Sequence, residues 1–120
     1  MINNLLWKII FILLVIYWCF LANFIQVLRG KNSLGTLLAS LGYESVPSIS
    51  DPSTNGTFYY SGGYNTSTHG SAIIGNPISS IQLELPKPGI RENSVQWKDY
   101  SNALVIALEK YFKVHYDIDL

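Results

Sequence analysis

The residues with the clearest capacity for chemistry are Gln82 and Glu84, in the segment Ser80-Ile-Gln-Leu-Glu-Leu-Pro86. Apolar residues alternate with these two polar ones, which predicts a strand with one apolar face and one polar face. Pro86 has no backbone N–H to donate and should end the strand. Because open α/β sheets build their sites at the carboxyl ends of strands, Glu84 is a candidate catalytic group. The alternative is an edge strand whose polar face meets water.

The two histidines do not form a recognisable metal site. Catalytic zinc takes about three protein ligands, and neither His69 nor His115 belongs to an H-x-x-E, H-x-H or H-E-x-x-H arrangement. Asp117 and Asp119 alternate with His115 close to the C-terminus, where we expect a fraying tail. His69 is a candidate ligand or substrate contact, with an exposed histidine as the simpler interpretation. The sequence has no glycine-rich phosphate loop or serine elbow either, so we expect no autonomous catalysis.

Length and charge narrow the possibilities further. The 120 residues suffice for one small domain. Eight acidic and eight basic residues leave the chain formally neutral, so nothing indicates a nucleic-acid partner. The single cysteine, Cys19, excludes an intrachain disulfide.

Most of the apolar excess lies near the start of the chain. Residues 9–28 contain no charged side chain, and a helix of about 20 residues would span the roughly 30 Å core of a bilayer. This pattern predicts a single-pass membrane anchor over residues 1–30, with the lipid bilayer as a partner, followed by a domain over residues 31–120. A buried core helix is the alternative, although so small a remainder could hardly cover it on all sides.

Capping residues predict two helices after the apolar segment. Asn32-Ser33 should cap a short amphipathic helix over residues 34–41, with Gly42 as its left-handed stop. Asn93 or Ser94 should cap a long final helix over residues 95–116, where apolar residues keep helical spacing.

Two tripeptides in the intervening polar region match the N-glycosylation pattern. They begin at Asn55 (Asn-Gly-Thr) and at Asn65 (Asn-Thr-Ser). Their modification would require this part of the chain to be lumenal. Such tripeptides also arise by chance in loops rich in Ser, Thr and Asn.

Several segments taken in order resemble the C-terminal part of the N-formylglutamate amidohydrolase-like hydrolases. The resemblance extends from about residue 28 to the C-terminus, and the matching segments are Leu28-Arg-Gly-Lys-Asn-Ser-Leu-Gly-Thr-Leu-Leu38, Gly42-Tyr43, Val46-Pro47-Ser48, Tyr60-Ser-Gly-Gly-Tyr-Asn-Thr66, His69-Gly70-Ser71 and Ile81-Gln-Leu-Glu-Leu-Pro86. These hydrolases are similar to zinc carboxypeptidases, with an α/β sheet and a metal-activated water that attacks an amide. The resemblance thus implies an α/β fragment with a partial sheet of that kind and a long C-terminal helix, preceded by one transmembrane helix.

The resemblance also implies roles for individual residues. Glu84 matches a strand-end glutamate that acts as general base beside the metal. Arg91 and His69 are candidates for binding a substrate carboxylate or for stabilising charge. The family's metal ligands belong to an N-terminal portion that is replaced here by the apolar segment. No metal is therefore expected in the chain as it stands, and zinc would bind if a complete site were assembled.

Three interpretations follow. The first is a membrane-anchored, inactive remnant of an amidohydrolase-like hydrolase. The second is a truncated or split metal-dependent amidohydrolase whose metal-binding half lies elsewhere. The third is a small single-pass membrane interaction protein, whose exposed sheet edge captures a strand from a protein partner that completes the sheet.

Overall fold

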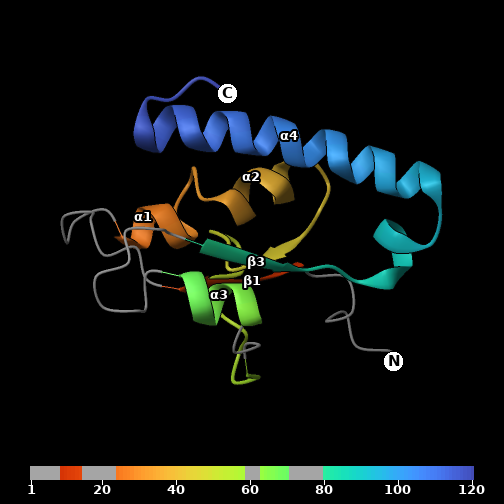
Figure 1. The fold of residues 1–120 in the computed structure, drawn as a ribbon, viewed down its shortest axis with the longest axis horizontal. Coiled ribbons are helices and arrows are strands. Elements are labelled where there is room, and N and C mark those ends of the chain that lie inside the picture. Colours follow the sequence, from red (N-terminus) through yellow and green to blue (C-terminus); the bar gives the residue numbers. More distant parts are fainter. Residues whose placement is uncertain (1–8, 15–23, 59–62, 71–79) are drawn as a thin grey trace.

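The computed structural model describes residues 9–14, 24–58, 63–70 and 80–120 (Figure 1). In chain order, the elements are β1 (Ile9–Leu14), α1 (Phe24–Arg29), α2 (Leu34–Ser40), β2 (Ser45–Val46), α3 (Tyr64–His69), β3 (Ser80–Glu84), the helical turn η2 (Lys87–Arg91) and α4 (Ser94–Tyr116). The predicted strand around Gln82 and Glu84 is therefore confirmed.

The three strands form one mixed sheet in the order β2-β1-β3. β1 is central and runs parallel to β2, where Ile9 lies opposite Ser45. β1 runs antiparallel to β3, where Ile10 lies opposite Glu84. A central strand has neighbours on both edges, which suits the uninterrupted apolar sequence Ile-Ile-Phe-Ile-Leu-Leu.

Helices cover the sheet on both sides. α4 crosses above α2 and the strands in Figure 1, and α3 lies on the opposite side of β3. The buried cluster lies between α4, α2 and the sheet, and its members are Val27, Leu34, Leu37, Leu38, Ile90, Tyr100, Ala107 and Tyr111. Leu83 and Leu85 pack against this cluster, so the apolar face of β3 is used by the core.

The ends of α2 agree with the predicted caps. The Ser33 hydroxyl accepts a hydrogen bond from the Thr36 backbone N–H at 3.3 Å, as an N-cap should. After the helix, the Gly42 N–H donates to the Ala39 carbonyl, and Gly42 has a φ of 94°. A side chain is strained at this positive φ, which explains why glycine ends the helix.

The long final helix is also confirmed. Asn93 is its N-cap, and the Asn93 Oδ1 atom accepts from the backbone N–H groups of Val95 at 3.1 Å and Gln96 at 3.0 Å. The helix buries one stripe of side chains: Tyr100, Ala103, Ala107 and Tyr111. It ends at Tyr116, and the C-cap residue Asp117 has a left-handed backbone with φ 54°.

The predicted fold class is wrong, and so is the predicted single-pass membrane localisation. Residues 9–14, inside the expected transmembrane helix, form the central strand, and Phe24–Arg29 is a helix of six residues. No helix in the part of the chain that the structure describes is long and apolar enough to cross a bilayer. The rest of the predicted span, residues 15–23, lies outside the described residues.

The expected arrangement of an anchor followed by a partial carboxypeptidase-like sheet is replaced by a different one. Most of the regular structure described is helical, and the strands contain six, two and five residues. β1, from the segment assigned to the anchor, pairs with two strands from the segment assigned to the domain. The sequence pattern led to the wrong element because an uninterrupted apolar segment is typical of both a membrane helix and a central strand.

The N-cap of α4 provides a stability test. Replacing Asn93 with Ala should lower the free energy of unfolding by roughly 1 kcal/mol, because two backbone N–H groups lose their acceptor. Urea denaturation measures the change. Asn102→Ala, at an exposed position inside the same helix, is the control and should cause no loss. Equal stability of the Asn93 variant and the parent would contradict the capping role.

Candidate functional site

Glu84 lies at the carboxyl end of β3 and is half-buried. Its Oε1 atom accepts a hydrogen bond from the Gln82 side-chain amide at 2.5 Å. The two residues are two positions apart on one strand, so both side chains lie on the face opposite Leu83. The carboxylate is thus held in a defined position on the polar face of the strand.

Gln82 also connects the strand to α3. Its Oε1 atom accepts from the backbone N–H of Gly63, the residue that caps α3, at 2.5 Å. A Cβ atom at position 63 would lie 2.9 Å from Gln82 Oε1, so glycine permits this close approach. An ionised carboxylate only accepts hydrogen bonds, which fixes the Gln82 amide with its NH₂ toward Glu84 and its oxygen toward Gly63.

The structure describes no contact that brings His69 or Arg91 to Glu84. His69 is the exposed last residue of α3, at the opposite end from Gly63, and its ring packs edge-on against Tyr64 with 6.3 Å between centroids. Arg91 is exposed at the end of η2, after the chain has turned away from β3. Neither residue is among the described hydrogen-bond or ion-pair partners of Glu84.

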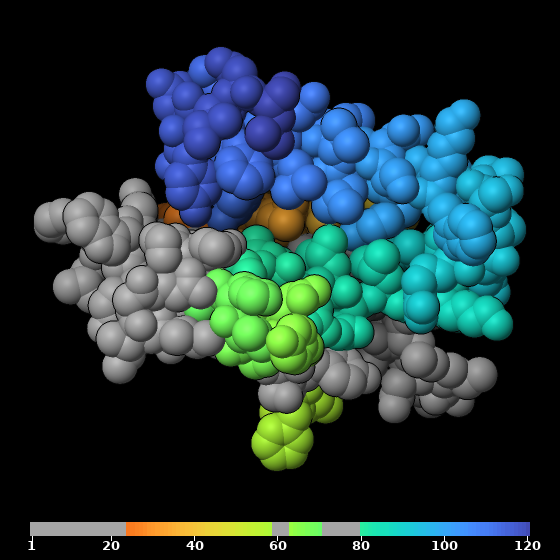
Figure 2. Space-filling model, viewed as in Figure 1, coloured from red at the N-terminus to blue at the C-terminus, as the bar shows by residue number. Residues whose placement is uncertain are grey.

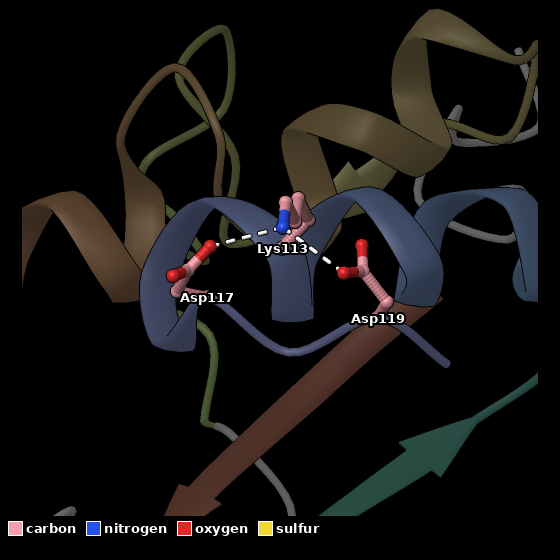
Figure 3. Close-up of polar contacts among 3 residues, drawn as sticks. All are labelled: Lys113, Asp117 and Asp119. Atoms are coloured by element: carbon pink, nitrogen blue, oxygen red, sulfur yellow. Dashed lines mark hydrogen bonds and ion pairs between the residues drawn. The ribbon is translucent and has the colours of Figure 1, made fainter.

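The charged residues near the C-terminus pair with one another. Lys113 Nζ lies 3.0 Å from Asp117 Oδ1 and 3.1 Å from Asp119 Oδ2, and Figure 3 shows both contacts. The hydrogen bonds that Lys113 donates to Asp117 and, to a smaller extent, to Asp119 raise the pKa of Lys113. His115 Nε2 instead lies 2.9 Å from the Asn32 carbonyl oxygen.

Metal-ligating side chains are scattered among these elements. Within residues 9–14, 24–58, 63–70 and 80–120, no three His, Cys, Asp or Glu side chains come together in a group that could hold a metal ion. The assignment of Glu84 as a general base beside zinc stays a prediction that rests on the resemblance.

A cavity that the sequence did not indicate lies beside the carboxyl end of β3. Its volume is about 400 Å³, and its lining comes from the turn after α2 and the chain around η2: Gly42, Tyr43, Glu44, Pro86, Pro88, Gly89 and Ile90. Gly42 in one segment and the Pro86-Lys-Pro88 sequence in the other indicate two turns. The sequence does not indicate that these turns lie side by side, because tertiary packing brings them together.

Beneath the cavity wall lies a buried tyrosine. Tyr100 is 4% exposed, and its ring meets that of Tyr43 edge-on at a centroid distance of 5.1 Å. Its hydroxyl is buried and has no hydrogen-bond partner among the described residues. Burial, followed by the nearby Tyr43, raises the pKa of Tyr100 from 10.0 to about 12.

Both glycosylation candidates are exposed. Asn55 lies in a turn with φ 51°, and Asn65 lies in the first turn of α3. Exposure is compatible with modification, which stays a prediction.

Comparisons with known protein families, with characterised proteins and with solved structures found no match to this chain. The amidohydrolase-like relationship therefore stays a hypothesis drawn from the segments named above.

Tyr100 provides a pH test. Because its pKa is raised, the folded chain keeps the Tyr100 proton at a pH near 10, where the unfolded chain releases it. The contribution of Tyr100 to the free energy of unfolding is therefore fully present below pH 10 and is lost between pH 10 and 12. Tyr100→Phe should reduce that loss, and at pH 7 its free energy of unfolding should lie within about 1 kcal/mol of the parent value, since the hydroxyl has no described partner.

Urea denaturation at pH 7, 10 and 11 measures both effects. Tyr64→Phe, at a tyrosine that is 76% exposed, is the matched control and should keep the parent's pH dependence. A large loss of stability at pH 7 in the Tyr100 variant would show that the hydroxyl has a partner.

Proposed function

We propose that this chain is a small binding module that accepts a strand of a partner polypeptide at the edge of β3. The observation that carries the proposal is the position of β3 at the end of the strand order β2-β1-β3, where β1 is its one strand neighbour among the described residues. In an antiparallel pair, alternate residues direct their N–H and C=O groups away from the neighbouring strand. Such outward groups on an edge strand are ready to pair with an added strand.

The exposure of β3 supports the proposal. None of its five residues is buried, and Ile81 is 38% exposed. In Figure 2 the teal atoms of this part of the chain lie at the surface, in a band between blue α4 and green α3.

The opposite edge of the sheet is far less suitable. β2 contains two residues, and Ser45 and Val46 are 2% and 4% exposed. So short and buried a strand offers few groups to a partner, which leaves β3 as the edge that fits this function.

β3 is also held in place before any partner arrives. Leu83 packs against the buried cluster on one face, and Gln82 binds the N–H of Gly63 and the carboxylate of Glu84 on the other. A preorganised edge loses little conformational entropy on binding. The polar pair thus has a positioning role in this proposal and needs no catalytic one.

A partner strand should match the two faces of β3. Its apolar side chains would lie beside Ile81 and Leu83, and its polar side chains beside Gln82 and Glu84. A lysine or arginine near Glu84 would add a charge pair at the rim of the contact.

Amide hydrogen exchange tests the proposal. The probe is a soluble ten-residue peptide of alternating valine and threonine with two lysines on its threonine face, added to the full chain at the lowest practical chain concentration. Binding should slow exchange of the outward N–H groups of residues 80–84 by about tenfold or more, because they gain acceptors. Ile81→Lys places a charge at the edge and should abolish the protection.

The matched control is Ile106→Lys, at an isoleucine of α4 that is 53% exposed. This variant should bind the peptide as the parent does. Equal loss of protection in both variants, or no protection at β3 in the parent, would contradict the proposal.

A metal-dependent amide hydrolase, completed by residues from elsewhere, is the second candidate. It is favoured by one observation: the Glu84 carboxylate is half-buried and held by Gln82 at the end of a strand. A carboxylate so placed could accept a proton from a metal-bound water.

We expect the chain by itself to be inactive, because His69 and His115 lie on α3 and α4 with different described partners. Purified full-length protein should contain far less than one zinc ion per chain, and it should hydrolyse N-acyl amino acids no faster than a Glu84→Gln variant. Near-stoichiometric zinc together with an activity that Glu84→Gln abolishes would establish the hydrolase instead.

A further inference from the structure

We infer that the strand received by β3 is β3 of a second copy of this chain, antiparallel to the first and centred on Gln82. The inference rests on the proposed function and names its partner. It would join two three-stranded sheets into one six-stranded sheet, a common size for globular proteins.

The pattern of polar and apolar residues in β3 is the same in both directions along the strand. In Ser80-Ile81-Gln82-Leu83-Glu84, polar and apolar residues alternate symmetrically about Gln82. A two-fold contact places residue i opposite residue j of the partner and j opposite i, so this pattern lets apolar side chains meet apolar ones and polar side chains meet polar ones. With the axis at Gln82, Ile81 lies opposite Leu83 of the second copy, and Ser80 lies opposite Glu84.

Other registers fit less well. A shift of one residue in the pairing would place Ile81 opposite Gln82 or Glu84 of the second copy, so the apolar face of one copy would continue into the polar face of the other. A shift of two residues keeps the faces together but leaves three of the five residues paired. Centring on Glu84 would set two carboxylates directly opposite each other, which is unfavourable.

Two further properties favour a second copy. Eight acidic and eight basic residues make the chain formally neutral, so two copies approach without net repulsion. Pairing through β3 would also leave the short, buried β2 at both ends of the joined sheet. The longer, exposed edge of each copy would be covered by the other, which removes a site for unspecific strand pairing.

Sedimentation equilibrium of the full chain over a range of concentrations tests the association. We expect a reversible monomer–dimer equilibrium. Ile81→Lys should raise its dissociation constant about tenfold or more, since two symmetry-related Ile81–Leu83 contacts are lost. Ile106→Lys should leave the constant unchanged. A chain that stays monomeric at all concentrations overturns the inference, and binding of the valine–threonine peptide by that monomer would show that the proposed function still holds.

Disulfide cross-linking tests the register, in a Cys19→Ser background that removes the single native cysteine. Directly opposite residues have Cβ atoms about 4.5–5.5 Å apart, close to the range that a disulfide bridges. Gln82→Cys should therefore cross-link to itself under mild oxidation. Ser80→Cys should not, since its two copies would be about 13 Å apart along the strands.

A second pair of variants keeps the test independent of the Gln82 hydrogen bonds. A mixture of Ile81→Cys and Leu83→Cys chains should give the mixed dimer as the main product, because these residues lie opposite each other, whereas the self-paired positions lie on a diagonal about 7–8 Å apart. A self-linked Ser80→Cys dimer, or a dimer by sedimentation that gives none of the expected cross-links, would place the contact elsewhere and overturn the inference.

Discussion

The contact between α4 and α2 holds the other elements of the fold together. Tyr100, Ala107 and Tyr111 from the buried stripe of α4 meet Leu37 and Leu38 in one cluster. A stripe with small alanines between two tyrosines lets the helix approach its neighbours closely while the rings fill the space at its ends. Burial of this apolar surface supplies the main driving force for folding so small a chain.

This arrangement determines which groups of β3 remain accessible to a partner. The buried cluster occupies one face of β3 through Leu83 and Leu85, and α3 lies against the other through Gly63 and Gln82. Within the part of the chain that the structure describes, both faces of β3 are thus in contact with other elements, and its backbone groups that point away from β1 have no strand partner. An interaction through backbone groups therefore follows more directly from the fold than chemistry on the polar face.

The polar residues illustrate the same point. Glu84 has the side chain and strand position of a catalytic base, but its described hydrogen bond with Gln82 belongs to a connection between β3 and α3. Tyr100 has the strongly raised pKa often found in functional sites, yet its position in the buried cluster accounts for the shift through burial. In both residues, a structural role explains features that would also suit a functional one.

Elements with local causes could be predicted from the sequence. Ser33, Gly42 and Asn93 mark helix ends because their side chains or backbone conformations act within a few residues, and the alternation around Gln82 marks a strand for the same reason. Long-range packing was needed to establish that Ile9–Leu14 is a strand, that a cavity lies beside Glu44 and that β3 is at the edge of the sheet. An apolar run becomes a central strand because two other strands, β2 and β3, supply the partners for its backbone groups, and such long-range pairing has no local trace.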